Sequence, residues 1–522
     1  MAKTYANLDA LIERENFEAG NDSEPSELRQ PGSVILKQLE NGQTYRNILR
    51  KPDFQRETAS WEPEKIVQLV KSFVSRHLIP PVILWESPEH NIFVIDGAHR
   101  LSAIIAWIAD DYGDRDISTA YFRGYDVKTQ KDAAQATREL MAREVGTYAM
   151  LSNQKALESA DPEVVTRAKN IAFSGIPTLW IPGDADVAEK SFFTMNQQAT
   201  AIDPVELVLI ENRNRPNAIA ARALLRAGTG SKLFWSEFST VAKQEIEQLA
   251  SGIHARLFVP EQTNPLTSLD QPLAGAGYSL HGLRLVWELV NFVNRVTDFK
   301  ALPEDRDGAA TLKLLRAVDK ATKLVFDDTY VGSLGLHPFV YFYSATGTFQ
   351  PTALLSAIRF FGDLEAKNKL VAFSRNRERF EEFLFANRHF SNEISKRHGA
   401  WQRGVLPTID MFTIVLEGAE KGLDGAEIMA KVIANSRLNN LAPREQTVKT
   451  GARFPRGTKN AARIAERMAH ETRCPVCNAR VFHRAYTNEH MLPIENGGVG
   501  SEGNAGFSHP FCNGARKAIG RG

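Results

Sequence analysis

The sequence predicts a multidomain α+β protein with an N-terminal α/β domain, a helical middle region and a small C-terminal module held together by metal. Three observations predict this class. Strand-like and helix-like patterns alternate over residues 51–215, and helical patterns dominate residues 216–440. All three cysteines of the 522-residue chain fall in its last 49 residues.

The composition is that of a globular protein with few cysteines. It is 43% hydrophobic and 24% charged, with a net charge of +1, and few cysteines argue against a disulfide-stapled secreted protein. The first residues lack the layout of a signal peptide, and no apolar run reaches the ~18 residues that a membrane span needs. We therefore expect a cytoplasmic protein without a membrane partner.

Positive charge is concentrated at the C-terminal end. From Arg444 onward there are 13 Lys or Arg and 6 Asp or Glu, a local balance of +7 (13 − 6). The remainder of the chain is therefore at −6 (1 − 7). This asymmetry assigns the basic surface to the C-terminal module.

The pattern along the chain predicts five segments. Residues 1–30 are expected to be a flexible arm, 31–215 an α/β domain, 216–440 a helical domain, 441–472 a basic linker or DNA-contacting arm, and 473–522 the C-terminal module. Hydrophobic periodicity and turn residues predict the elements within them. These are a helix capped by Ser60, strands Val82–Trp85 and Ile92–Ile95, a helix over 101–108, a strand Thr178–Ile181, a helix starting at Asp203–Pro204, an amphipathic helix Leu280–Val296, and one or two long helices over 363–397.

Two residue pairs predict a metal site in the C-terminal module. Cys474 and Cys477 form the first pair, and His509 and Cys512 form the second, with 31 residues between Cys477 and His509. Three thiolates and one imidazole suit tetrahedral zinc, and a module of ~45 residues needs a metal to fold. The two pairs therefore predict a structural zinc site.

Other assignments of these residues remain open at this point. The cysteines could be core residues with His509 on the surface, or His509 could serve a second, catalytic ion and leave zinc with three cysteines. His483 is a further candidate ligand, although a surface or DNA-facing position is the simpler interpretation.

The segment between the two pairs carries polar residues in a characteristic order. Asn488-Glu489-His490 is followed by a Gly-Gly turn, then by Asn504, and after the second pair by Asn513. In this order the segment, about residues 473–517, resembles the HNH endonuclease family. The resemblance implies a ββα-metal fold, with strands around Val481 and 486–489 and a short helix after the second pair.

The same resemblance implies roles in phosphodiester hydrolysis. His490 would be the general base, Glu489 and Asn513 would hold a catalytic Mg²⁺ or Mn²⁺, and Asn504 would orient the His490 ring. The sequence departs from the family pattern by Glu in place of the commoner Asp at 489 and Asn in place of His at 513. The alternative is a structural zinc knuckle that binds DNA without cutting it.

A second candidate site lies in the N-terminal domain, in the string Asp96-Gly97-Ala98-His99-Arg100 between a strand and a helix. Gly97 permits a tight turn, and His99 and Arg100 fall at the helix start, where free N–H groups and the dipole favour an anion. This pattern indicates a phosphate site. The alternative is an Asp-capped turn with two basic surface residues.

Neighbouring strings extend that site. With Phe54-Gln55-Arg56 and the string ending at Asn196, the pattern over residues 30–215 resembles the DGQQR domain of the ParB/sulfiredoxin-like superfamily. That domain occurs in GmrSD-type modification-dependent restriction enzymes and in the phage-defence proteins SspE and BrxU. The resemblance implies that Asp96, Gly97, His99 and Arg100 bind a nucleoside triphosphate, with Arg56 and Asn196 completing the site. Ala98-His99 in place of Gln-Gln favours binding over hydrolysis.

Together these patterns predict an antiphage restriction-type DNA endonuclease. The N-terminal domain would sense a nucleotide or a DNA modification and control a C-terminal HNH nuclease that nicks or cleaves phage or modified DNA. A homodimer would supply two such modules for cutting both strands. The alternatives are a ParB-like DNA-binding regulatory protein with a non-cleaving zinc module, and a nucleotide triphosphatase whose HNH part is degenerate.

Overall fold

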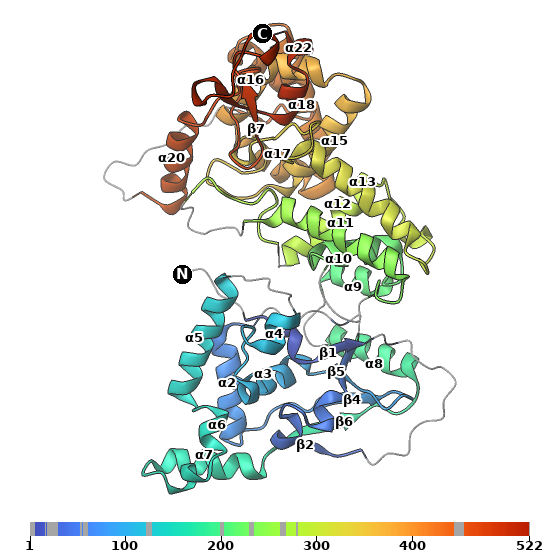
Figure 1. Cartoon of the computed structure of the whole chain (residues 1–522). Coiled ribbons are helices and arrows are strands. Elements are labelled where there is room, and N and C mark those ends of the chain that lie inside the picture. Colours follow the sequence, from blue (N-terminus) through green and yellow to red (C-terminus); the bar gives the residue numbers. More distant parts are fainter. Residues whose placement is uncertain are drawn as a thin grey trace. The chain divides into compact units, whose positions relative to one another are not determined.

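The chain folds into two compact units (Figure 1). The first comprises Met1–Asn214 and Thr229–Lys243, and the second comprises Arg215–Gly228 and Gln244–Gly522. This computed structural model describes residues 6–15, 17, 30–52, 55, 61–121, 128–198, 203–228, 234–260, 268–277, 280–442 and 454–520.

A six-stranded mixed sheet forms the centre of the first unit. Its order is β1-β3-β5-β4-β6-β2, with β4 antiparallel to β5, β2 antiparallel to β6, and the other neighbours parallel. The predicted α/β class and the three predicted strands are confirmed. The strands are β1 (Glu13–Glu15), β2 (Ser33–Ile35), β3 (Leu49–Pro52), β4 (Val82–Glu86), β5 (Ile92–Asp96) and β6 (Gly175–Trp180).

Helices cover both faces of this sheet because its central strands are apolar on both sides. In β5, Ile92 and Val94 belong to one hydrophobic cluster, and Phe93 and Ile95 belong to another that includes Phe192 of α8. Alternate side chains of a strand point to opposite faces, so each cluster lies on one face. The helices of this unit are α1 (Thr44–Asn47), α2 (Pro63–Val74), α3 (Ala98–Ala109), α4 (Asp116–Tyr121), α5 (Lys128–Glu144), α6 (Tyr148–Leu151), α7 (Pro162–Phe173), α8 (Ala185–Gln198) and α9 (Pro204–Glu211).

The N-terminal boundaries differ from the predictions. Residues 6–15 and 17 are not a flexible arm, since Leu8 and Leu11 join the core and Asp9 is buried against Arg14 and Lys51. Helix α2 begins at Pro63, whose fixed φ suits the first helical position, and its N-cap is Glu62. The predicted cap, residue 60, lies outside the described residues. The predicted helix start at Asp203–Pro204 is confirmed in α9, where the Asp203 side chain caps the Val205 N–H.

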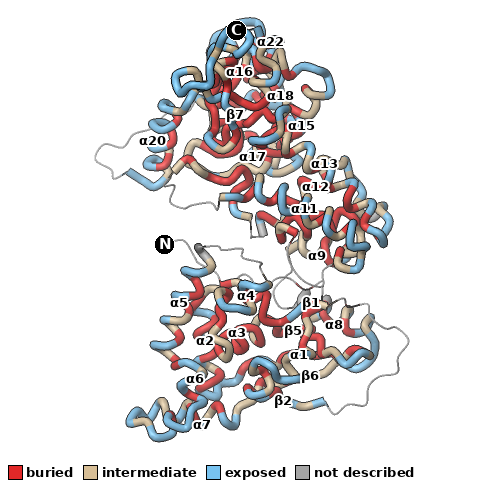
Figure 2. The backbone as a smooth tube through the Cα atoms, in the orientation of Figure 1, coloured by how far each residue is buried: buried red, intermediate tan, exposed pale blue. Residues whose placement is uncertain are grey.

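The second unit is mainly helical, and many residues of its helices are buried (Figure 2). The predicted run over 363–397 is divided among α15, α16 and α17, which are separated by short non-helical stretches. The helices are α10 (Pro216–Leu225), α11 (Thr240–Phe258, which belongs to this unit from Gln244 onward), α12 (Leu280–Val293), α13 (Ala309–Val325), α14 (Pro338–Tyr341), α15 (Pro351–Ala366), α16 (Leu370–Ala386), α17 (Phe390–His398), α18 (Val405–Glu420), α19 (Gly425–Ala434), α20 (Arg456–Ala469), α21 (Pro510–Gly514) and α22 (Arg516–Ile519). Of the helices that the structure describes, none combines the length and apolarity that crossing a bilayer requires.

The C-terminal residues form a small hairpin followed by a helix. Strand β7 (Thr487–His490) pairs antiparallel with β8 (Ala505–Ser508), and α21 follows. The prediction of a strand around Val481 is wrong. The buried Val481 follows an isolated bridge between Arg473 and Arg480 and belongs to no named strand. The strand that pairs with β7 instead comes after the loop.

Candidate functional site

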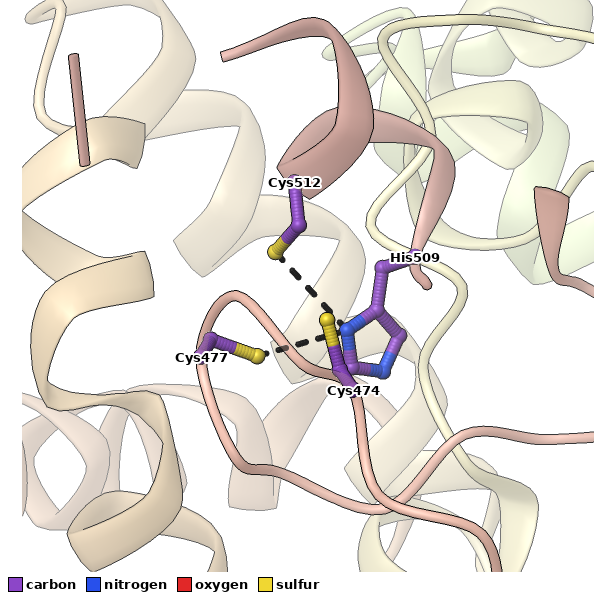
Figure 3. Close-up of side chains that lie close together, drawn as sticks. All are labelled: Cys474, Cys477, His509 and Cys512. Atoms are coloured by element: carbon purple, nitrogen blue, oxygen red, sulfur yellow. Dashed lines mark hydrogen bonds between the residues drawn. The ribbon is translucent and has the colours of Figure 1, made fainter. Parts of the chain in front are cut away.

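The four predicted zinc ligands converge in the C-terminal module (Figure 3). Cys474, Cys477, His509 and Cys512 are buried, and their ligand atoms all lie within 4.8 Å of one another. His509 Nδ1 lies 3.4 Å from Cys477 Sγ and 3.8 Å from Cys512 Sγ. We call these four residues the metal cluster. Their donor set and spacing fit a tetrahedral metal such as zinc.

The His509 ring is oriented for metal binding. Its Nε2 lies 3.0 Å from the carbonyl oxygen of Arg480, which places the ring proton on Nε2 and leaves Nδ1 free to face the sulfurs. This geometry places His509 with the cysteines and away from the surface. His483 lies outside the cluster, with its Nε2 3.3 Å from Asp270 Oδ1.

The electrostatics of the cluster favour a bound cation. Burial, followed by the neighbouring thiols, raises the pKa of Cys477 well above its ordinary value. The Cys474 thiol, more than burial, raises the pKa of Cys512 to about 12. Hydrogen bonds from the other two thiols lower the pKa of Cys474. One thiolate therefore forms readily, whereas three do not form together easily in this interior unless a positive charge compensates them.

The metal cluster is packed against the helical part of the same unit. Phe482 contacts Phe326 and His337, with ring centroids 5.7 Å and 5.1 Å apart, and the Phe511 N–H donates to the Ser333 carbonyl at 2.8 Å. The fully buried Arg377 of α16 contributes positive charge that lowers the pKa of Cys477 and Cys512, in opposition to the larger effects above.

Asn504 fixes the loop between β7 and β8. Its side-chain oxygen accepts from the Leu492 N–H at 2.6 Å, and its Nδ2 donates to the carbonyls of Leu492 and Val499 at 3.1 and 2.9 Å. Gly498 allows this close approach, since a Cβ there would lie 1.8 Å from the Leu492 oxygen. The amide is thus used by the loop backbone and not by the His490 ring, contrary to the expectation for Asn504.

We expect Asn504→Ala to loosen the loop without unfolding the unit. The change removes three hydrogen bonds, each worth about 1 kcal/mol. The Leu492 amide should exchange its hydrogen faster, as measured by hydrogen–deuterium exchange. The exposed Asn496, changed to alanine, is the control and should leave that rate unchanged. Equal exchange in both variants would contradict the role given to Asn504.

Glu489 lies on the buried side of β7 and is held by an arginine that the sequence did not single out. Arg516 Nη1 lies 2.8 Å from Glu489 Oε1 and also donates to the His490 carbonyl at 2.6 Å. Glu489 Oε2 is buried and has no hydrogen-bond partner among the described residues. One carboxylate oxygen is thus occupied by a cationic side chain, and the other remains available to an ion.

His490 follows Glu489 in the chain, and Asn513 of α21 contacts the same strand. The half-buried His490 is the last residue of β7 and directly follows the buried Glu489. From α21, Asn513 Nδ2 donates to the Asn488 carbonyl at 3.1 Å. Glu489 and His490 are thus neighbours at the end of β7, and Asn513 contacts the backbone of that strand from α21.

The N-terminal candidate site forms the predicted turn at the end of β5. Gly97 adopts a φ of 91° at the N-cap of α3, and Arg100 Nη2 donates to Asp96 Oδ2 at 2.7 Å and to the Pro81 carbonyl at 3.0 Å. The His99 ring stacks on Trp61, with centroids 5.8 Å apart. Asp96, His99 and Arg100 are thus brought to one turn.

A buried glutamine adjoins this turn. Gln55 Nε2 donates to the carbonyls of Val94 and Ile95 at 3.3 and 3.2 Å, and its Oε1 is buried without a hydrogen-bond partner among the described residues. The sequence shows Gln55 only as part of the string Phe54-Gln55-Arg56 and indicates no role of its own for this glutamine. Arg56 lies outside the described residues, and Asn196 lies in α8 with its side chain outside them.

The comparison with known families concerns the first unit. Residues 35–211 match the family described as GmrSD restriction endonuclease, N-terminal domain. This match confirms the predicted relationship to GmrSD-type restriction enzymes for that segment, which includes the Asp96–Arg100 turn. No curated protein and no solved structure matches the chain.

Proposed function

We propose that this protein is an antiphage restriction-type DNA endonuclease, in which the first unit senses a nucleotide or a DNA modification and an HNH module at the C-terminal end nicks or cleaves DNA. The family match over residues 35–211 supports the restriction context. The observation that carries the nuclease assignment is the hairpin with Glu489 and His490, which lies next to the buried metal cluster.

The chain supplies the groups that phosphodiester hydrolysis requires. In the proposal, His490 accepts a proton from water, whose oxygen attacks phosphorus as the bond to the leaving oxygen breaks. Glu489 Oε2 and the Asn513 side-chain oxygen would hold Mg²⁺ or Mn²⁺, which stabilises the negative charge on phosphate. Arg516 positions Glu489 through the contact to its other oxygen.

The metal cluster has a structural role in this proposal. Zinc bound there would join the segment around Cys474 to α21, from which Asn513 reaches the backbone of β7. The hairpin and α21 would then keep their relative positions. The cluster itself is buried, so it does not contact a substrate.

Dependence on a divalent ion tests the nuclease assignment. Supercoiled plasmid and phage DNA, with and without base modification, would be incubated with the full chain in Mg²⁺, in Mn²⁺ and in excess chelator. We expect nicked or linear products only with a divalent ion. Binding without strand breaks on every DNA would instead favour the non-cleaving DNA-binding alternative.

We further expect Asp96→Ala to weaken nucleotide binding by the first unit about tenfold or more. Asp96 fixes the Arg100 guanidinium through a charge-assisted hydrogen bond, and such bonds contribute roughly 1.5–3 kcal/mol. Affinity for a fluorescent nucleoside triphosphate and phosphate release would both be measured, with the exposed Asp132 changed to alanine as the control. Unchanged affinity in Asp96→Ala would show that the site is placed wrongly.

A further inference from the structure

Helix α20 lies within the segment that the sequence predicts to be a linker, and its buried face attaches it to the second unit. Asn460, Ile464 and Met468 are buried at successive turns. Asn460 Nδ2 donates to the Thr346 carbonyl at 3.2 Å, and Arg480 Nε donates to the Met468 carbonyl at 2.8 Å. The described part of the linker is therefore an anchored helix.

The exposed side of α20 carries a row of positive charge. Arg456, Lys459, Arg463 and Arg467 are all exposed and are spaced by three or four residues, so they lie on one side of the helix within roughly 80° of its circumference. The row extends over about 16 Å. We call these four residues the basic row.

The charge of α20 is not balanced within the helix. Glu466 is its one acidic residue, which gives a net charge of +3 (4 − 1). Helix α16, by contrast, carries three arginines and three glutamates. The remaining exposed positions of α20 include Thr458, Ala462 and Ala465, which are too small to bury in a membrane.

Arg480 connects this helix to the metal cluster. Its side chain bonds to Met468 near the C-terminal end of α20, and its carbonyl lies 3.0 Å from His509 Nε2. Arg480 thus contacts both α20 and His509, a residue of the metal cluster. A polyanion bound along the basic row would therefore be held by a helix that is attached to this cluster.

We propose that the basic row of α20 binds the sugar–phosphate backbone of duplex DNA and presents it to the C-terminal module. This inference rests on the proposed function, because it names the surface through which that nuclease holds its substrate. Arginine pairs well with phosphate oxygens, and contacts of this kind position DNA without reading its sequence. The binding is electrostatic and independent of base sequence.

The salt dependence of DNA binding tests this proposal separately from cutting. All proteins would carry His490→Ala, and their affinity for an unmodified duplex would be measured between about 50 and 200 mM salt. Changing Arg463 and Arg467 to glutamine removes two charges. The slope of log K against log salt should become shallower by about 1.8, and the affinity at the lowest salt should fall about tenfold or more.

Two further variants serve as controls. Lys421→Gln with Lys431→Gln removes two exposed charges elsewhere in the unit and should change neither slope nor affinity. Arg463→Lys with Arg467→Lys keeps the charge and should retain most of the binding. An unchanged slope in the glutamine variant, an equal loss in the Lys421/Lys431 control, or no salt-dependent binding by the parent would each overturn the proposal.

The outcome also separates this inference from the proposed function. Binding that depends on the basic row, together with no cutting by the protein with His490 intact, would overturn the nuclease assignment alone. Cutting by that protein, together with binding that ignores the basic row, would overturn the inference alone.

Discussion

Replacing His490 with alanine is expected to lower the rate of DNA cutting by about 10²–10⁴-fold, the usual contribution of a general base. The ring is half-buried at the end of β7, and it forms no hydrogen bond or ion pair with the other described residues. Its removal should therefore leave the fold, the metal content and DNA affinity close to those of the wild type. Single-turnover cutting of a labelled duplex measures the rate.

A matched histidine controls for the loss of an imidazole. His470 follows α20 and is exposed, so His470→Ala should cut at the wild-type rate. Equal rates in wild type and His490→Ala would rule out His490 as the base. A loss of zinc or of thermal stability in His490→Ala would instead point to a structural role.

Cys477→Ser is expected to release the bound zinc and to destabilise the second unit by about 4 kcal/mol or more, as large losses follow the removal of a structural metal. Cys477 is fully buried and lies 3.4 Å from His509 Nδ1, so serine leaves an incomplete ligand set in an apolar interior. Phe482 and Phe511 contact the helical part of the same unit, so the helices should also unfold at a lower temperature.

Zinc content by mass spectrometry and thermal unfolding by circular dichroism measure these effects. His483→Ala is the control, since His483 lies in the same module but outside the cluster, and it should keep one zinc per chain. Retention of zinc by Cys477→Ser at the wild-type level would contradict the ligand assignment.

Local patterns in the sequence were sufficient for the features that depend on short spacing. The two pairs Cys474/Cys477 and His509/Cys512 predicted the metal cluster because each pair sits in one turn. The apolar runs of β4 and β5 predicted strands because both faces of those strands are buried. The turn at Gly97 followed from its place between a strand and a helix.

Features that depend on distant contacts were not predictable in this way. The partner strand of β7 lies beyond a loop, and Arg516 reaches Glu489 across 27 residues. Helix α20 has few apolar residues, so its sequence resembles a solvated linker until Asn460, Ile464 and Met468 find their partners. The use of Asn504 by the loop follows from the backbone path around Gly498, which spacing alone does not define.

We propose that His490 makes this chain a DNA nuclease, and the strand breaks that the chain produces in DNA measure this activity. The full chain and its His490→Ala variant would be incubated in Mg²⁺ with phage DNA that carries base modifications and with its unmodified counterpart, and strand breaks would be counted. We predict breaks in at least one DNA with the wild type and a near-complete loss of them with His490→Ala. Intact DNA throughout with the wild type, or equal breaks with both proteins, would contradict the claim.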